Sequence, residues 1–242
     1  MTNSPAMRPS TLVATWNLER KTYARAPGMK AIEYLTALGP HVLVLTEARQ
    51  SYPAGDGSLV TSQSWGSDDE RKVVMQSQSG WRDIDDFGHP DLPAARFVAA
   101  TTSTPIGDIR VMGVCISWHM ANVVYGDRDK KPWQDHIAYC EVLQTLIEAH
   151  DRSVPLVIAG DFNQCLPRVK GANRAAAAAI GRTFADTNVI TADEVVGHER
   201  PAIDHIAVVG LDATSVIGWH NIIDGQRCTD HSGVMADLTA PS

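Results

Sequence analysis

Short runs of apolar and β-branched residues recur along the whole chain, separated by polar segments. Each run has the length of a strand and is rich in the residue types that favour strands over helices. Several runs are apolar at every position, which is typical of strands buried on both faces of a sheet. The pattern predicts strands at Leu12–Thr15, Val42–Thr46, Lys72–Met75, Arg96–Thr101, Arg110–Trp118, Leu156–Ala159, Ile203–Val209 and Val234–Leu238.

Other segments carry helical signals. Met29–Leu38 places apolar residues at three-residue steps and stops at Gly39-Pro40, a strong helix terminator. In Asp135–His150 the apolar residues fall on one side of a helix, and Asn173–Phe184 contains a five-alanine run of high helix propensity. We expect a helix in each of these segments.

Two polar segments are predicted to be loops. Ser51–Glu70 is rich in Ser, Gly and Asp, residue types that favour turns. Trp81–Pro93 carries several aspartates, and we interpret it as a solvated acidic surface. The alternative is that these aspartates form an edge of a functional site that repels polyanions.

Many strands with few helices predict an α/β fold of two packed sheets with helices on their outer faces. No charge run, Pro/Gly-rich linker or repeat divides the sequence. We therefore expect a short N-terminal tail, residues 1–10, followed by one domain over residues 11–242. Polar clusters follow or precede several predicted strands, and a rigid sheet can project such side chains into one cleft.

Composition and charge narrow the class of protein. Of the 242 residues, 44% are hydrophobic and 20% are charged, which is ordinary for a globular protein. The formal net charge of −7 argues against tight, non-specific coating of nucleic acid by Lys and Arg, although a bound metal ion can supply local positive charge. The four cysteines form no CxxC pair, and no stretch is apolar enough for a membrane span. We expect a reduced, cytoplasmic protein without membrane insertion or an obligate protein partner.

The strongest chemical signal is the segment Gly160-Asp161-Phe162-Asn163, which follows a predicted buried strand. Gly160 lets the backbone turn closely, and residues two apart in an extended chain project to the same face. Asp161 and Asn163 can therefore address one reacting centre. An Asx turn that closes a strand would give the same local pattern, so the weight of this motif depends on its companions.

Four further segments place polar residues at predicted strand ends. An imidazole that acts as acid or base needs its second nitrogen held, and His231 has a separate upstream carboxylate, Asp204, available for this. Glu47 lies where a buried strand reaches the surface, and hard divalent cations prefer such oxygen ligands. The segments are Thr15-Trp16-Asn17-Leu18-Glu19, Leu45-Thr46-Glu47-Ala48, Ile203-Asp204-His205-Ile206 and Thr229-Asp230-His231-Ser232.

Taken in order along the chain, these five segments resemble the motifs of the endonuclease/exonuclease/phosphatase (DNase I-like) family. The GDFN tetrapeptide and the final Asp-His pair are the most specific parts of the match, which extends from the first predicted strand nearly to the last residue. The resemblance implies a four-layer α/β/β/α sandwich, in which two packed, mostly antiparallel sheets are flanked by helices. It also implies dependence on Mg²⁺ or Mn²⁺.

The resemblance further implies which residues hold the metal. Glu47 would be the principal ligand, assisted by Asn17, Glu19 and Asp230. The sequence shows one clear carboxylate cluster of this kind, which is compatible with one ion or with two.

Catalytic roles follow from the same resemblance. Asp161 would orient or deprotonate the attacking water, and Asn163 would hold a phosphate oxygen. His231, oriented by Asp204, would stabilise the developing charge or act as acid or base.

Family members usually place a phosphate-contacting His or Tyr just after a central strand. His119, at the end of the predicted strand Arg110–Trp118, is the candidate. The alternative is His136, which lies at the start of a predicted helix and is more easily explained as a packing residue. Arg168 follows the GDFN segment closely and is a further candidate for contact with a phosphate backbone.

These residues predict an enzyme that hydrolyses phosphodiesters, with DNA or RNA as the favoured substrate. The alternative substrates are a small phosphate ester or a lipid headgroup, but no apolar membrane-docking hairpin supports the lipid. A catalytically inactive phosphate-binding module is the alternative from another class. It is disfavoured because every chemical role has a candidate residue. Endo- and exonucleolytic cleavage are both compatible with the sequence.

Overall fold

The computed structural model describes residues 8–241 except 125, 127, 194 and 200. Most of the predicted N-terminal tail, residues 1–7, lies outside the described residues. The first strand, β1, begins at Thr11, where the predicted domain starts. None of the described helices is both long enough and apolar enough to cross a membrane.

The first of two large sheets has seven strands in the order β12-β15-β1-β2-β5-β3, with β4 paired to β5. Neighbouring strands in this sheet are antiparallel, except for β1 and β2, which are parallel. The strands are β1 (Thr11–Asn17), β2 (Val42–Arg49), β3 (Ser58–Thr61), β4 (Ser64–Trp65), β5 (Ser67–Ser77), β12 (Asp212–Trp219) and β15 (Gly233–Thr239).

The second sheet has six strands in the order β10-β11-β9-β8-β7-β6 and is antiparallel except for the parallel pair β8 and β9. A small hairpin of β13 (Ile222–Ile223) and β14 (Gln226–Arg227) stands apart from both sheets. The strands are β6 (Arg82–Asp85), β7 (Phe97–Thr104), β8 (Gly107–Cys115), β9 (Leu156–Asp161), β10 (Asn188–Val189) and β11 (Asp204–Val209).

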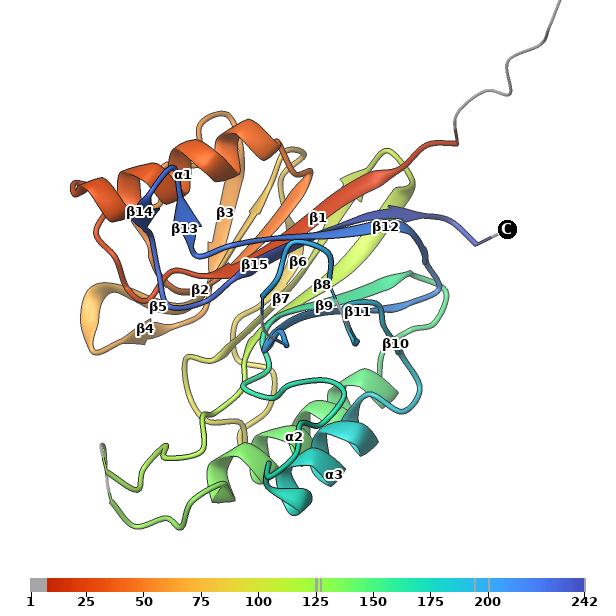
Figure 1. The fold of residues 1–242 in the computed structure, drawn as a ribbon. Helices are drawn as coiled ribbons and strands as arrows, with labels where there is room; N and C mark the ends of the chain where they lie inside the picture. Colours follow the sequence, from red (N-terminus) through yellow and green to blue (C-terminus); the bar gives the residue numbers. More distant parts are fainter. Residues whose placement is uncertain (1–7, 125, 127, 194, 200, 242) are drawn as a thin grey trace, which may run out of the picture.

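Helices cover the outer faces of both sheets (Figure 1). Helix α1 (Ala26–Leu38) lies over the first sheet beside the β13–β14 hairpin, while α2 (Gln134–Glu148) and α3 (Arg174–Thr183) pack against each other over the second. Helix α1 ends as predicted at Gly39, whose φ of 59° is left-handed and whose N–H bonds to the Leu35 carbonyl. The expected four-layer α/β/β/α sandwich is confirmed.

Three apolar cores hold the layers together. The core between the sheets contains fully buried valines such as Val13, Val111 and Val157. A second core joins the second sheet to α2 and α3, and a third joins the first sheet to α1. Central strands are therefore apolar on both faces, which is why their sequences read as continuous apolar runs.

Edge strands are where the sequence prediction was wrong. The segment Ser51–Glu70, predicted to be a loop, contains β3, β4 and the start of β5, and Trp81–Pro93 contains β6. β12 was not predicted because most of its residues are exposed or half-buried, so its sequence lacks a continuous apolar run. The predicted strand Arg110–Trp118 ends at Cys115, and Ile116 continues the apolar run only because it packs into the α2–α3 core.

One end of the sandwich collects the polar residues. β1, β2, β8 and β9 run toward this end, and the antiparallel strands β5, β7, β11 and β15 start from it. Asp161 at the end of β9 is directly paired with Asp204 at the start of β11. Residues far apart in the sequence thus meet where strands of opposite direction end and begin.

Candidate active site

A cavity of about 740 Å³ opens at this end of the sandwich, between the two sheets. It lies among strand ends and the loops that follow them, so rigid elements position its walls. It is lined by Asn17, Arg20, Glu47, Trp65, Lys72, Arg96, Cys115, Trp118, Asp161, Asn163, Asp230 and His231.

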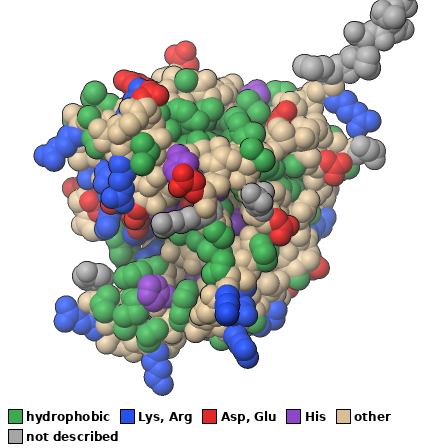
Figure 2. Space-filling model, viewed as in Figure 1, with side chains coloured by type: hydrophobic (Ala, Val, Ile, Leu, Met, Phe, Trp, Pro, Cys, Tyr) green, Lys and Arg blue, Asp and Glu red, His purple; other side chains and the backbone are tan. Residues whose placement is uncertain are grey.

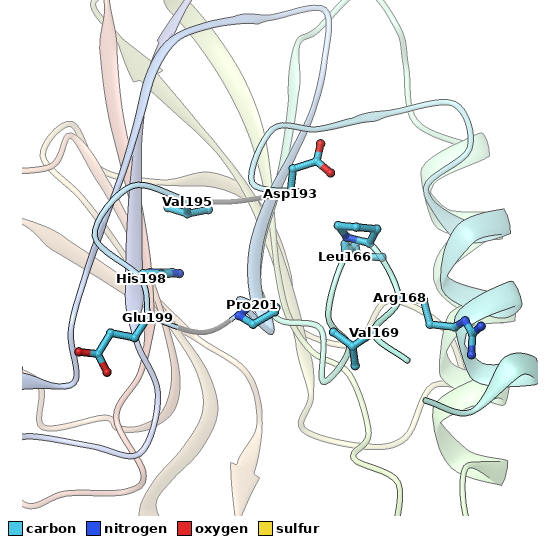
Figure 3. A pocket seen from close by; sticks show the side chains of 9 residues that line it. Leu166, Arg168, Val169, Asp193, Val195, His198, Glu199 and Pro201 are labelled. Carbon is cyan, nitrogen blue, oxygen red and sulfur yellow. The ribbon is translucent and has the colours of Figure 1, made fainter. Parts of the chain in front are cut away.

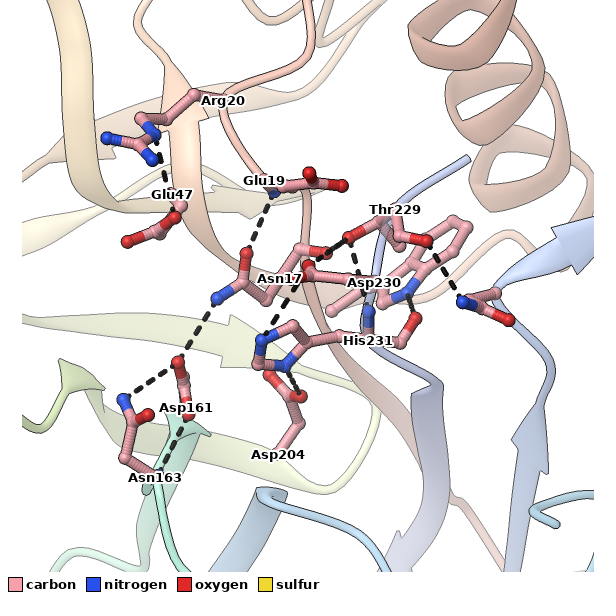
Figure 4. A network of polar contacts seen from close by, with 12 residues as sticks. Asn17, Glu19, Arg20, Glu47, Asp161, Asn163, Asp204, Thr229, Asp230 and His231 are labelled. Carbon is pink, nitrogen blue, oxygen red and sulfur yellow. Dashed lines mark hydrogen bonds and ion pairs between the residues drawn. The ribbon is translucent and has the colours of Figure 1, made fainter. Parts of the chain in front are cut away.

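Asp161 is the centre of a hydrogen-bond network on one wall of this cavity (Figure 4). Its Oδ2 accepts from the side-chain amides of Asn17, at 3.1 Å, and Asn163, at 3.0 Å. Its Oδ1 accepts from the backbone N–H of Asn163 at 2.8 Å, and Asn163 Nδ2 also donates to the Ile116 carbonyl at 2.9 Å. The carboxylate of Asp161 is therefore fixed in orientation by Asn17, at the end of β1, and by Asn163, just after β9.

The backbone around this network is held in uncommon conformations. Gly160 has φ 140°, and a Cβ built on it would lie 1.9 Å from the Val114 carbonyl oxygen of the neighbouring strand. Asn163 and Glu47 have φ of 52° and 45°, in the left-handed region that few non-glycine residues adopt. Such residues cluster at functional sites, where the surrounding structure enforces them.

His231 and Asp204 form a tight pair beside Asp161. His231 Nδ1 lies 2.5 Å from Asp204 Oδ2, and Asp204 is buried. Burial by itself lowers the pKa of the imidazole, but Asp204, with further contributions from Asp161 and Asp230, raises it to about 10. The imidazolium is therefore the stable form at neutral pH.

The pKa of Asp161 is raised as well, which for a carboxyl group favours the neutral form. Burial raises the pKa of its carboxyl to about 7, assisted by the negative charges of Asp204 and Glu47 and opposed by His231. Asp161 therefore takes up a proton near neutral pH, as a general base requires. Two hydrogen bonds attach the segment that carries His231 to the end of β1. Thr229 Oγ1 donates to the Asn17 carbonyl at 2.7 Å, and Trp16 Nε1 donates to the His231 carbonyl at 2.8 Å.

Glu47 faces the cavity from the first sheet and is paired with cations. Its Oε1 lies 2.7 Å from Lys72 Nζ, and its Oε2 lies 3.7 Å from Arg20 Nε. Burial raises the pKa of this carboxyl, but Lys72, Arg20 and Arg96 outweigh burial and lower it overall. Glu47 is therefore ionised at neutral pH.

The donor set fits a hard divalent cation. Asn17, Glu47 and Asp230 bring amide and carboxylate oxygens to the same cavity, and each Glu47 oxygen keeps a free lone pair beside its one cation partner. Beside these residues, single ligand atoms of Asp161, Asp204 and His231 all lie within 4.8 Å of one another. The cavity thus offers oxygen ligands from both sheets.

A positively charged wall, formed by Lys72 and Arg96, faces these carboxylates. Lys72 is 5% exposed and Arg96 is 6% exposed, and both cations lie over the Trp65 ring, at 5.0 and 5.3 Å from its centroid. The sequence alone does not single out Lys72, and for Arg96 it favours a structural or surface role over a place in the site. The signal was a charged residue at the head of an apolar run, in Lys72–Met75 and Arg96–Thr101.

Several predicted site residues lie away from the cavity walls. His119 is exposed and packs against the Trp133 ring, and His136 is buried with its Nδ1 2.8 Å from the Ser117 carbonyl oxygen. Glu19 donates its backbone N–H to Asn17 Oδ1, but its carboxylate turns away from Asp161 and pairs with Lys21 at 3.0 Å (Figure 4).

Arg168 borders a separate hollow of about 440 Å³. Figure 3 shows it on the α3 side of this hollow, across from His198 and Glu199. Arg168 is exposed and donates to the Ala172 carbonyl at 2.8 Å. Nearness to the GDFN segment in sequence does not bring this side chain to Asp161.

Comparison with solved structures identifies the fold. The chain is similar to humanized D. rerio TDP2 (14% identity, 96% of this chain and 99% of that chain, TM-score 0.73). It is also similar to an AP endonuclease from Archaeoglobus fulgidus (15%, 93% and 98%, TM-score 0.70) and to the 3'-5' exonuclease NExo from Neisseria meningitidis (21%, 94% and 99%, TM-score 0.66). No protein-family model and no curated protein matches the sequence. The fold is the DNase I-like fold that the motifs predicted.

Proposed function

We propose that the protein is a divalent-metal-dependent phosphodiester hydrolase that acts on nucleic acid. One observation carries the proposal: the Asn17–Asp161–Asn163 network and the Asp204–His231 pair border the same cavity. A hydrogen-bonded carboxylate beside an imidazolium supplies both a proton acceptor and a positive charge, as hydrolysis of a phosphodiester requires.

In this proposal Asp161 accepts the proton of the attacking water. Its raised pKa, about 7, suits a group that takes up a proton near neutral pH. The hydrogen bonds from Asn17 and Asn163 hold the carboxylate in one orientation, which lowers the entropic cost of the reaction. Both Asn163 Nδ2 hydrogens already bond to protein oxygens, so Asn163 could hold a phosphate oxygen only by exchanging one of these bonds.

His231 offsets the negative charge that develops on the phosphoryl oxygens. Asp204 holds the imidazole at 2.5 Å and keeps it protonated. Because His231 lies largely buried beside the cavity, its charge acts in a medium of low polarity and is worth more there than in water.

A divalent cation, Mg²⁺ or Mn²⁺, completes the proposal. When bound, the cation polarises a phosphoryl oxygen and stabilises the leaving oxygen. Glu47, Asn17 and Asp230 would hold it, because their oxygens line the cavity. Glu19 would act in an outer position, through the backbone N–H that fixes the Asn17 side chain.

Similar proteins support nucleic acid as the substrate class. One similar structure is D. rerio TDP2 in complex with a single-strand DNA product, and another is NExo bound to a product DNA hairpin. On the face drawn in Figure 2, positive and negative side chains are interspersed with apolar ones among the described residues. With a net charge of −7, this favours local recognition of the strand at the cavity over coating of a duplex.

A phosphatase acting on a phosphomonoester is the second candidate function. The NExo structure at 21% identity is described as that of a 3' phosphatase. The same residues would serve either ester, because both reactions transfer a phosphoryl group to water.

A substrate panel in Mg²⁺ or Mn²⁺, with EDTA as the control, tests the proposal. The panel should contain single- and double-stranded DNA, an abasic duplex, RNA, a 3'-phosphorylated oligonucleotide and bis-p-nitrophenyl phosphate. We expect metal-dependent cleavage of at least one nucleic-acid diester. Release of phosphate from the monoester alone would favour the phosphatase, and no turnover at all would favour an inactive binding module.

A further inference from the structure

Arg96 is a buried guanidinium with an incomplete set of protein partners. Its Nη1 lies 3.2 Å from the Cys115 carbonyl oxygen and 3.5 Å from Cys115 Sγ, and one face of the guanidinium lies over Trp65. Among the described residues, no carboxylate oxygen lies within 4.0 Å of it. Arg96 is nevertheless only 6% exposed and borders the candidate active-site cavity.

A buried charge of this kind is costly unless an opposite charge joins it. A guanidinium has five N–H donors in a planar fork, and the contacts to Cys115 involve only one of its nitrogens. The remaining donors suit an anion with two oxygens, such as a phosphate, which a guanidinium binds in a bidentate manner.

The position of Arg96 is fixed before any ligand arrives. Its backbone carbonyl accepts from the Cys115 N–H at 3.0 Å and from the Tyr139 hydroxyl at 2.8 Å. Both contacts lie in the buried core under the second sheet, and Trp65 limits movement of the side chain from the other side. A donor that is already in place loses little entropy when it binds.

The end of β8 links Arg96 to the reacting residues. Cys115, which accepts from Arg96, is directly paired with Asp161 on the neighbouring strand. The next residue, Ile116, accepts from the Asn163 side chain at 2.9 Å. Arg96 and Asn163 are thus anchored to consecutive carbonyls at one strand end, and both border the same cavity.

We propose that Arg96 binds a non-bridging oxygen of the scissile phosphate. The inference rests on the proposed function and assigns to Arg96 the phosphate contact for which His119 was the sequence candidate. In the reaction, the water oxygen bonds to phosphorus, the water proton passes to Asp161, and the bond to the leaving oxygen breaks with its electron pair. Arg96 offsets the charge that builds on the non-bridging oxygen.

Lys72 provides an internal contrast. Its ammonium lies over the same Trp65 ring, but it is already neutralised by Glu47 at 2.7 Å. Its charge therefore supports the carboxylate of Glu47, while the charge of Arg96 is available to substrate.

The test compares Arg96 variants on bis-p-nitrophenyl phosphate. Arg96→Gln, which keeps a donor for the Cys115 carbonyl, should lower kcat/KM about 100-fold, and Arg96→Lys should lose less because it keeps the charge. Arg96→Ala should regain activity in a saturable manner when millimolar guanidinium is added, which a purely structural role would not produce. The matched control Arg182→Gln, on the exposed surface of α3, should behave as wild type. Wild-type kcat/KM in Arg96→Gln would overturn the proposal.

A binding measurement separates this inference from the proposed function. Inorganic phosphate should change tryptophan fluorescence in the wild type and in Arg182→Gln, but much less in Arg96→Gln, because Trp65 lies under the guanidinium. Wild-type protein that binds phosphate in this way but hydrolyses no diester would refute the proposed function, while the assignment of Arg96 as an anion-binding residue would still hold. Equal phosphate binding by Arg96→Gln and wild type would refute the anion site. Circular dichroism and Tm establish that each variant is folded. If Arg96→Gln and Arg96→Ala do not fold, Arg96→Lys is compared with the wild type instead.

Discussion

Asp161 is a buried carboxyl group that accepts three hydrogen bonds from Asn17 and Asn163 and lies beside the His231–Asp204 pair. Asp161→Asn preserves the shape of the side chain but cannot accept the water proton. We expect kcat to fall at least about 100-fold, the lower range for loss of a general base. Steady-state kinetics on the active panel substrate measures the loss, with the exposed Asp186→Asn as control. Unchanged kcat in Asp161→Asn would contradict the assigned role.

The His231–Asp204 pair predicts an unusual dependence of activity on pH. The pKa of His231 is raised to about 10, so the imidazolium persists through neutral pH and is lost as the pH rises toward 10. Asp204→Asn removes the largest raising influence, so the alkaline loss of activity should begin at a lower pH than in the wild type. A profile of kcat/KM from pH 5 to about 10.5 tests this. An alkaline limb at the same pH in both proteins would refute the pairing as the cause.

At the scale of elements, the turn after β9 depends on one glycine. A Cβ at Gly160 would lie 1.9 Å from the Val114 carbonyl oxygen, and φ 140° is itself unfavourable for other residues. Gly160→Ala should therefore lower the free energy of unfolding by more than about 2 kcal/mol. Gly181→Ala is the matched control, because Gly181 lies in α3 with no atom within 4 Å of an added Cβ. That substitution should stabilise the protein by about 0.5–1 kcal/mol. Urea unfolding compares the two, and equal stability would contradict the argument.

At the scale of the whole molecule, binding of a divalent ion should stabilise the folded chain, because Asn17, Glu47 and Asp230 are distant in sequence and meet at one cavity only when the chain is folded. Mg²⁺ at about 100 times its Kd should add about 2.7 kcal/mol to stability. Thermal unfolding with Mg²⁺ or EDTA measures the change in Tm. Glu47→Gln should reduce the shift, whereas Glu33→Gln, exposed on α1, should leave it intact. An identical shift in Glu47→Gln would remove Glu47 from the ligand set.

The sequence by itself determined the fold class and the order of its chemical motifs. Buried central strands must be apolar on both faces, so β1, β2, β9 and β11 can be recognised in the sequence as apolar runs. The polar residues at the ends of these runs can be recognised for the same reason. The structure brings Asn17, Glu47, Asp161, Asn163, Asp230 and His231 to one cavity and pairs Asp204 with His231, while their chemical roles stay predictions.

Only the tertiary structure decided which other residues join them. The edge strands β3, β6 and β12 are stabilised by pairing with a neighbour, which leaves little periodic signal in their own sequence. His119 and Arg168 follow the right motifs along the chain but lie away from the cavity. Lys72 and Arg96 are distant in sequence, yet they reach Glu47 and the end of β8. The physical reason is that antiparallel pairing makes β5 and β7 start at the edge where β2 and β8 end, and no local pattern specifies which strands will be neighbours.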